Sequence, residues 1–260
     1  MAYTERGSGP LLVLVHGAGL DYRYWAGQME PFSAKYRTIA VSRRHYYPEP
    51  WDGDGEFSLS QHVADLTAFI KQLGVGAVHL VGHSRGATVA LYAVAADSSI
   101  AKTLVFAEGG MGMAEFAQTD PIEQEQTAQY VRSLTAKFAD GDIDGGLEAF
   151  ITRINGPDAW QAIPESSRQV LRDNAWTLVA GLLDIPRWPA LECEDMKRLE
   201  LPVLVVGGAN SLPRWHLLLD KFQSCFHRAE RVVIANAGHA MSLMNPVAFN
   251  AALLTFLDGK

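Results

Sequence analysis

Five consecutive residues near the middle of the chain, Gly82-His83-Ser84-Arg85-Gly86, have the types and spacing of a nucleophile turn. They stand between an apolar run at 78–81 and a helix-like stretch at 87–96. A sharp strand-to-helix turn that lifts a serine hydroxyl clear of a sheet edge needs neighbours without bulk, which Gly82 and Gly86 supply. The pattern predicts that Ser84 is a catalytic nucleophile. The alternative is a tight turn that only closes a parallel-sheet crossover.

A serine hydroxyl is a poor nucleophile at neutral pH, so it needs a base that takes its proton and a third group that holds the base. Of the eight histidines, His239 lies on a glycine-bearing loop after the last predicted strand, 231–235. That position brings it to the same sheet edge as Ser84. We predict that His239 is the base; the alternative is a loop histidine that caps the final helix.

Two backbone N–H groups are needed to stabilise the negative charge that develops on the attacked carbonyl oxygen. We expect one from Arg85, directly after the nucleophile, and one from Ala18, in the loop His16-Gly17-Ala18-Gly19. The alternative for this loop is a plain strand-to-helix turn. The Arg85 side chain is a separate matter, because its guanidinium could contact substrate or pair with a nearby acid.

The elements that must position these residues form an alternating pattern. Apolar runs typical of strands buried on both faces alternate with helical patterns, which predicts the α/β class and an open, doubly wound parallel sheet with its ligand site beyond the carboxyl ends of the strands. Between 111 and 201 the pattern is helical only, so we expect a helical cap inserted into a core of 1–110 and 202–260. The runs are 11–15, 38–41, 78–81, 101–107, 202–207 and 231–235, and the cap helices are expected near 121–139, 143–154 and 164–183.

Composition limits the possible partners and compartments. The 22 basic and 29 acidic residues give a net charge of −7 without a basic block, so neither nucleic acid nor a membrane surface is an expected partner, and the substrate is expected to be small and neutral. Cys193 and Cys225 lie far apart, without metal spacing or a disulfide framework, which favours a reducing compartment. With no signal-peptide core, we expect a cytoplasmic protein. Neither a metal nor an organic cofactor is expected.

Taken together, His16-Gly17-Ala18-Gly19, Gly82-His83-Ser84-Arg85-Gly86 and Gly238-His239 resemble the α/β-hydrolase superfamily in order and spacing over nearly the whole chain. The resemblance implies a mostly parallel sheet with a cap and a triad of nucleophile, acid and histidine. The chain starts too late for the family's usual first strand, which leaves about seven strands. The family's common acid follows the strand at 203–207, and there this sequence has Asn210 where an aspartate would be expected.

Glu108 is the candidate that replaces the missing carboxylate. It ends the strand at 101–107, and this position is similar to the acid after the sixth strand in haloalkane dehalogenases and zearalenone lactonase-type hydrolases. We therefore predict a triad of Ser84, His239 and Glu108. The alternative is that Glu108 only caps the following glycine turn and that the enzyme uses Asn210 or no acid.

A serine at position 84 supports acyl chemistry, whereas relatives with an aspartate there attack alkyl carbons. Aromatic and apolar residues near the catalytic edge favour a hydrophobic or ring-containing substrate, although packing is the alternative for each of them. We predict a cofactor-independent serine hydrolase, monomer or homodimer, that cleaves an ester or lactone through an acyl-enzyme. The alternatives are C–C cleavage, lyase or cyclase chemistry at the same site, or an inactive ligand-binding homologue. The expected substrate contacts are Tyr46, Met111, Trp160, Trp176, Trp188 and Asn210.

Overall fold

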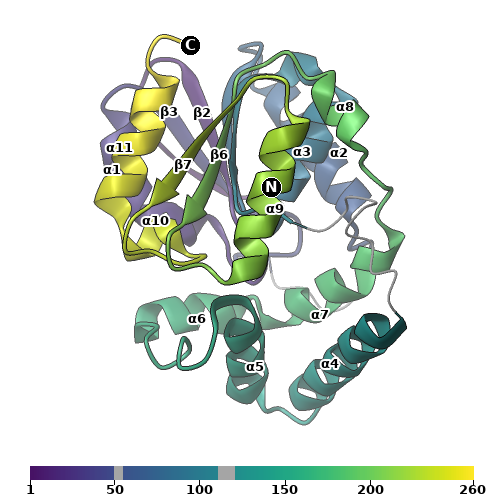
Figure 1. Ribbon diagram of the computed structural model, residues 1–260. Coiled ribbons are helices and arrows are strands. Elements are labelled where there is room, and N and C mark those ends of the chain that lie inside the picture. The colour runs from purple at the N-terminus through teal and green to yellow at the C-terminus, as the bar shows by residue number, and fades with distance from the viewer. Residues whose placement is uncertain (50–54, 111–120) are drawn as a thin grey trace.

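Seven strands form a single sheet in the computed structural model, which describes residues 1–49, 55–110 and 121–260 (Figure 1). The sheet order is β1-β3-β2-β4-β5-β6-β7; β1 is antiparallel to β3, and the other neighbours are parallel. The strands are β1 Tyr3–Arg6, β2 Leu11–Val15, β3 Arg37–Val41, β4 Val78–His83, β5 Ala101–Ala107, β6 Val203–Gly208 and β7 Ala229–Ile234. The α/β-hydrolase fold expected from the sequence is confirmed, but β1 was not predicted, because this largely exposed edge strand has no aliphatic run.

The inner strands are buried because helices cover both faces of the sheet. Along β2, Leu11, Val13 and Val15 pack on one face, while Leu12 and Leu14 pack on the other, as the two-residue period of a strand requires. The first face is covered by α2 Leu59–Gln72, α3 Arg85–Ala96, α8 Cys193–Lys197 and α9 Pro213–Cys225, and the second by α1 Ala26–Ser33, α10 Met241–Met244 and α11 Pro246–Leu257.

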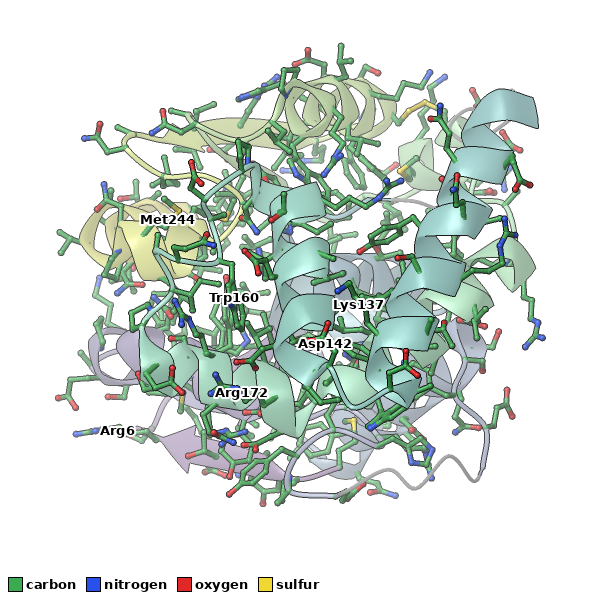
Figure 2. All side chains as sticks on the ribbon, turned by 90° about the horizontal axis from the view of Figure 1, so that it is seen from below. Arg6, Lys137, Asp142, Trp160, Arg172 and Met244 are labelled. Carbon is green, nitrogen blue, oxygen red and sulfur yellow. A yellow bond between two sulfur atoms is a disulfide. The ribbon has the colours of Figure 1, made fainter. Side chains whose placement is uncertain are left out.

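Four helices between β5 and β6 form an insertion below the sheet in Figure 1, beyond the carboxyl ends of the strands. The third predicted helical stretch, 164–183, is divided at Asn174, whose side chain is bonded to Asp21 and to the backbone of Tyr47 in the core. Ion pairs such as Lys137–Asp142 and Arg172–Asp144 lie on the outer surface of the insertion (Figure 2). The helices are α4 Pro121–Ala139, α5 Ile143–Asn155, α6 Glu165–Asp173 and α7 Ala175–Asp184.

The segment after α7 returns to the sheet. Leu191, Met196 and Leu199 pack in the same core as α2 and α3, so the insertion over the carboxyl edge ends earlier than the predicted boundary at 201. A disulfide joins Cys193 to Cys225 and links α8 to α9. The expectation of two unpaired cysteines is therefore wrong, and the argument from composition for a reducing compartment no longer holds. Among the described residues, no helix is both long and apolar enough to cross a membrane.

Candidate active site

Ser84 lies on a strained turn between β4 and α3. Its φ of 53° is in the left-handed region, and its side chain is partly exposed, whereas His83 and Arg85 beside it are buried. A Cβ atom at position 82 would lie 2.4 Å from Ala87 Cα, and one at position 86 would lie 2.3 Å from the Val15 carbonyl oxygen. Only glycine fits at either position, which is the steric requirement that the sequence pattern indicated.

Glu108 and His239 form a buried hydrogen-bonded pair at the same edge. His239 Nδ1 donates to Glu108 Oε2 at 2.7 Å, and Glu108 is fully buried just past the end of β5. The other carboxylate oxygen, Oε1, accepts hydrogen bonds from the Gly208 N–H at 2.8 Å and from the Ser211 hydroxyl at 2.6 Å. The last residue of β6 and the loop after it, where the family's common acid would lie, therefore supply hydrogen-bond donors to Glu108. Asn210 in this loop is exposed, and its backbone N–H donates to the Ala237 carbonyl.

The ring of His239 is held between two other rings. Trp215 stacks on it at 4.1 Å between ring centroids with an interplanar angle of 20°, and the His83 ring lies 4.8 Å away. Burial, followed by the proximity of His239, lowers the pKa of His83 to about 3, so His83 is neutral and its Nε2 donates to the His239 carbonyl at 2.8 Å. Because Glu108 occupies Nδ1 of His239, Nε2 is the atom left to accept a proton.

Two hydrogen bonds to its carbonyl group fix the orientation of the peptide between Gly17 and Ala18. The Gly17 carbonyl accepts hydrogen bonds from His16 Nδ1 at 2.8 Å and from Arg43 Nη2 at 3.0 Å. Since a trans peptide directs its C=O and N–H groups to opposite sides, these bonds turn the Ala18 N–H away from His16 and Arg43. A Cβ at position 17 would lie 3.2 Å from Ser84 Cβ, so this loop lies against Ser84, the place where a loop that stabilises an oxyanion would have to lie.

Burial keeps the imidazole of His16 neutral. Desolvation, followed by the charge of Arg43, holds the pKa of His16 well below its usual range. Its Nε2 accepts the backbone N–H of Arg43 at 3.1 Å, which leaves the ring proton on Nδ1 for the Gly17 carbonyl. His16 is therefore a fixed donor to the loop that carries Ala18.

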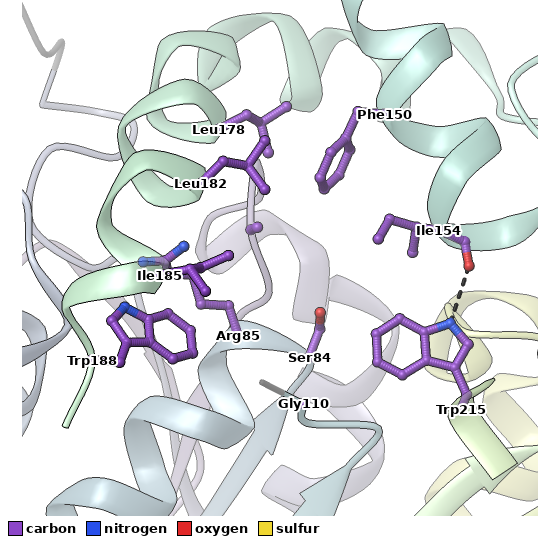
Figure 3. Close-up of a pocket in the computed structure, with 11 residues that line it drawn as sticks. Ser84, Arg85, Gly110, Phe150, Ile154, Leu178, Leu182, Ile185, Trp188 and Trp215 are labelled. Atoms are coloured by element: carbon purple, nitrogen blue, oxygen red, sulfur yellow. Dashed lines mark hydrogen bonds between the residues drawn. The ribbon is translucent and has the colours of Figure 1, made fainter. Parts of the chain in front are cut away.

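Ser84 opens onto a cavity between the carboxyl edge of the sheet and the insertion (Figure 3). Apolar side chains of α5 and α7 face the serine across it, and Trp188 and Trp215 lie on either side. The indole N–H of Trp215 donates to the Ile154 carbonyl at 3.1 Å, which links the end of α5 to the ring stacked on His239. The lining residues are Ala18, Ser84, Arg85, Gly110, Phe150, Ile154, Leu178, Leu182, Ile185, Trp188 and Trp215.

Most of the residues expected to contact substrate do not line this cavity. Of the six, Trp188 lines the cavity, and Met111 lies outside the described residues. Tyr46 is buried against His16 and Arg43, and Trp160 packs in the insertion's own core. Trp176 is 47% exposed and packs on Phe138, and Asn210 is also exposed. The apolar pairs Phe150/Ile154 and Leu178/Leu182 line the cavity but were not predicted, because their i, i+4 spacing is also typical of ordinary core positions.

Among the described residues, no group of three or more His, Cys, Asp or Glu side chains is arranged to hold a metal ion.

Known proteins are similar to this chain in sequence and in fold. A putative non-heme bromoperoxidase, BpoC, of Mycobacterium tuberculosis is 25% identical over 98% of this chain and 97% of that protein. A 2-(acetamidomethylene)succinate hydrolase of Mesorhizobium japonicum is 24% identical over 98% and 90% of the two chains. The structure of a thermophilic esterase from Thermogutta terrifontis, with malate bound, matches with a TM-score of 0.78 and 22% identity over 98% and 92%.

The family model described as the alpha/beta hydrolase family matches residues 12–252. This range includes the loop at Ala18, the turn at Ser84, and both Glu108 and His239. The chain therefore belongs to the alpha/beta hydrolase family.

Proposed function

We propose that the protein is a serine hydrolase that cleaves a carboxylic ester or lactone with a hydrophobic or ring-containing portion. The observation that carries the proposal is Ser84, which opens from a strained turn onto an apolar cavity at the edge where His239 is bonded to buried Glu108. A hydroxyl in this setting can be activated by one base and attack a carbonyl carbon.

The proposed reaction has two halves. Ser84 Oγ bonds to the substrate carbonyl carbon as His239 Nε2 takes the hydroxyl proton, and the N–H groups of Ala18 and Arg85 stabilise the oxyanion. The carbon–oxygen bond to the leaving alcohol then breaks, His239 returns the proton to that alcohol, and an acyl-enzyme remains. Water, deprotonated by His239, cleaves the acyl-enzyme to the acid and restores Ser84. Glu108 stabilises the imidazolium in both halves.

Two of the three relatives have names that support hydrolysis. The Mesorhizobium relative is named a 2-(acetamidomethylene)succinate hydrolase and the Thermogutta protein an esterase, whereas the Mycobacterium relative is named a putative non-heme bromoperoxidase. The choice of ester or lactone for this chain rests on the apolar wall of the cavity and on a serine nucleophile. Non-hydrolytic chemistry at this site would use His239 without acylating Ser84, which makes acylation the deciding property.

The test is intact mass spectrometry after exposure to a small fluorophosphonate. We expect one adduct on the native protein, none on Ser84→Ala and slow formation on Glu108→Gln. The matched control is Ser99→Ala, which removes an exposed serine away from the cavity and should react as the native protein does. A folded native protein that forms no adduct would mean that Ser84 is not an activated nucleophile.

A further inference from the structure

The side chain of Arg85 is a buried cation in the cavity wall, next to the nucleophile. Its guanidinium lies near Ile185 and Trp188 in Figure 3, and its side chain is only 7% exposed. In the described part of the chain the guanidinium donates one hydrogen bond, from Nη2 to Asp184 Oδ2 at 3.3 Å, and Nε is buried without a partner. The guanidinium also lies over the Trp188 ring, 4.8 Å from its centre. The face of the group is therefore engaged by an aromatic ring, while most of its N–H donors are not used.

Asp184 is engaged more closely by other donors than by Arg85. Its Oδ2 atom accepts hydrogen bonds from the Leu59 backbone N–H and from Trp188 Nε1, both at 2.7 Å. The contact with Arg85 is single and longer, so it lacks the paired, parallel hydrogen bonds of a strong guanidinium–carboxylate interaction. Asp184 thus holds α2 and Trp188 in place and only partly satisfies Arg85.

A second buried guanidinium, that of Arg43, adds positive charge on the same side of the site. Arg43 is 1% exposed; its guanidinium donates to the neutral Gly17 carbonyl and lies 4.4 Å from the centre of the Tyr46 ring. Within the described ranges, no carboxylate pairs with it. Burial, and after it the proximity of Arg43, act against the charge of Arg85 and lower its pKa to about 10, although Tyr46 and Asp184 oppose this shift. At neutral pH both guanidinium groups remain charged.

Both guanidinium groups are therefore buried cations without full pairing. Among the described residues Asp184 is the carboxylate that contacts Arg85, whereas none pairs with Arg43 and the buried carboxylate of Glu108 is engaged by His239. The neighbouring His16 and His62 are kept neutral by burial. A buried charge without full pairing is costly, so a ligand carboxylate that completed the pairing of Arg85 would be favoured there. Among the described residues that line the cavity, Arg85 is the one charged side chain, and the others except Ser84 are mainly apolar.

We propose that Arg85 binds a carboxylate of the substrate, so that the protein acts on esters or lactones that carry an anionic group beside a hydrophobic portion. This proposal rests on the proposed hydrolase function and differs from the neutral substrate that composition favoured. The guanidinium is carried by the residue next to Ser84, so a carboxylate bound there lies within one side-chain length of the acyl group under attack. When the substrate carboxylate binds, it competes with Asp184 for the guanidinium of Arg85.

Binding measured by isothermal titration calorimetry tests this without turnover. In a Ser84→Ala background we expect 3-phenylpropionate to bind about 10- to 100-fold more tightly than 3-phenylpropanamide. The carboxylate forms a charged hydrogen bond with Arg85, whereas the amide forms only a neutral acceptor's hydrogen bond, which is weaker. Arg85→Met should remove this preference. Asp184→Asn should increase it several-fold, because an amide oxygen still accepts from Leu59 and Trp188 but has no negative charge with which to compete for the cation.

A purely structural ion pair gives a different pattern. Both variants would then lower the melting temperature while leaving the ratio of the two affinities unchanged. Equal affinities in the Ser84→Ala protein, a preference that survives Arg85→Met, or no binding of either probe would each overturn the proposal.

Turnover separates this inference from the proposed function. The substrates are 4-nitrophenyl hydrogen succinate and its uncharged methyl ester, compared by kcat/KM in the native protein and in Arg85→Met. A preference for the charged ester that Arg85→Met abolishes supports both proposals. Hydrolysis of both esters at equal kcat/KM leaves the hydrolase standing and overturns the carboxylate site. Hydrolysis of neither, with the binding preference intact, overturns the hydrolase and leaves the carboxylate site.

Discussion

The carboxyl edge of the sheet and the helical insertion that faces it are built in different ways. At the edge, Ser84 and Glu108 have strained backbone, with φ of 53° and 40°, and buried polar groups such as Glu108 and His16 are held by several hydrogen bonds. The insertion has an apolar core of its own, with its ion pairs on the outer surface. It presents mainly aliphatic side chains to the cavity.

From this difference we expect the edge to determine the chemistry and the insertion to determine substrate selectivity. The proposed catalytic groups come from strand ends and are fixed by hydrogen bonds, whereas the facing wall of the cavity comes from helices that pack through apolar contacts. Substitutions at the edge should therefore lower kcat, and substitutions in the insertion should mainly change KM.

The largest effect is expected for Glu108→Gln. An amide of the same size has one acceptor oxygen, whereas the carboxylate accepts from His239 on one oxygen and from Gly208 and Ser211 on the other. It also cannot stabilise the imidazolium by charge, and the corresponding change of acid to amide in a serine triad costs about 10⁴-fold in kcat. Single-turnover kinetics on an activated ester measures this, with circular dichroism to confirm the fold. Near-native kcat would remove Glu108 from the triad.

The double variant Glu108→Gln/Asn210→Asp tests whether the loop after β6 can resume the role of the acid. We expect no recovery of kcat, because Asn210 is exposed and its backbone is tied to Ala237, while the side chain at 108 fills the site beside His239. Recovery of a large part of the lost activity would show that the two loops are interchangeable and would weaken the assignment of Glu108.

Arg43→Met should have the next largest effect, about 10- to 100-fold on kcat. It removes one of the two hydrogen bonds that fix the Gly17 carbonyl, so the Ala18 N–H loses part of its orientation, and direct loss of an oxyanion donor costs about 10²- to 10³-fold. The matched control is Arg44→Met, which removes an adjacent, exposed arginine paired with Asp65 and should leave kcat unchanged. Equal effects of the two variants on kcat would contradict the assignment.

Much of the edge could be predicted from the sequence because its determinants are local. The glycines at 82 and 86 are required by backbone contacts within one turn, and Ser84 and His239 follow recognisable strands. Glu108 followed from topology, since the carboxyl ends of neighbouring strands β4, β5 and β6 meet at one edge. The short strand β1 could not be predicted because it is an edge strand without a buried pattern.

The cavity wall and the disulfide could not be predicted in the same way. Whether Leu178 faces the cavity and Trp176 faces solvent depends on how α7 packs against α4 and the loop at Gly19, which is a tertiary property. Cys193 and Cys225 are 32 positions apart and meet only because α8 packs on α9. Their spacing alone contains no sign of this contact.

The two regions should also differ in their response to acid. Burial is the largest cause that lowers the pKa of His16, His62 and His83, to about 3 for His83, whereas residues 111–201 contain no histidine. Below pH 6.5 the unfolded chain binds protons that these folded side chains do not, so the free energy of unfolding falls as pH falls, by about 1.4 kcal/mol per pH unit for each such histidine well below that pH.

Urea unfolding between pH 7 and pH 5 measures this slope. His62→Phe is the informative variant, because residue 62 lies among aromatic rings, 4.8 Å from that of Phe57, and a phenyl ring fits there without titrating. The dependence of the free energy of unfolding on pH should become weaker by the contribution of one histidine, up to about 1.4 kcal/mol per pH unit. An unchanged slope would mean that His62 does not resist protonation in the folded state.

The smallest effect is expected for Leu182→Ala in the insertion. Leu182 lines the cavity, so its truncation removes apolar contact with the substrate at a cost of about 0.8 kcal/mol for each lost methylene contact, or a rise in KM of about 3- to 10-fold for a long or ring-containing ester. Its neighbour Leu183 is 54% exposed and lies outside the wall, so Leu183→Ala is the matched control and should leave KM unchanged. Because the catalytic edge is untouched, kcat should stay within about 2-fold, and an acetyl ester too short to reach Leu182 should show no change in either constant. A loss in kcat that is equal for the short and the long ester would mean that the insertion helps to place the reacting groups, and the division between edge and insertion would then fail.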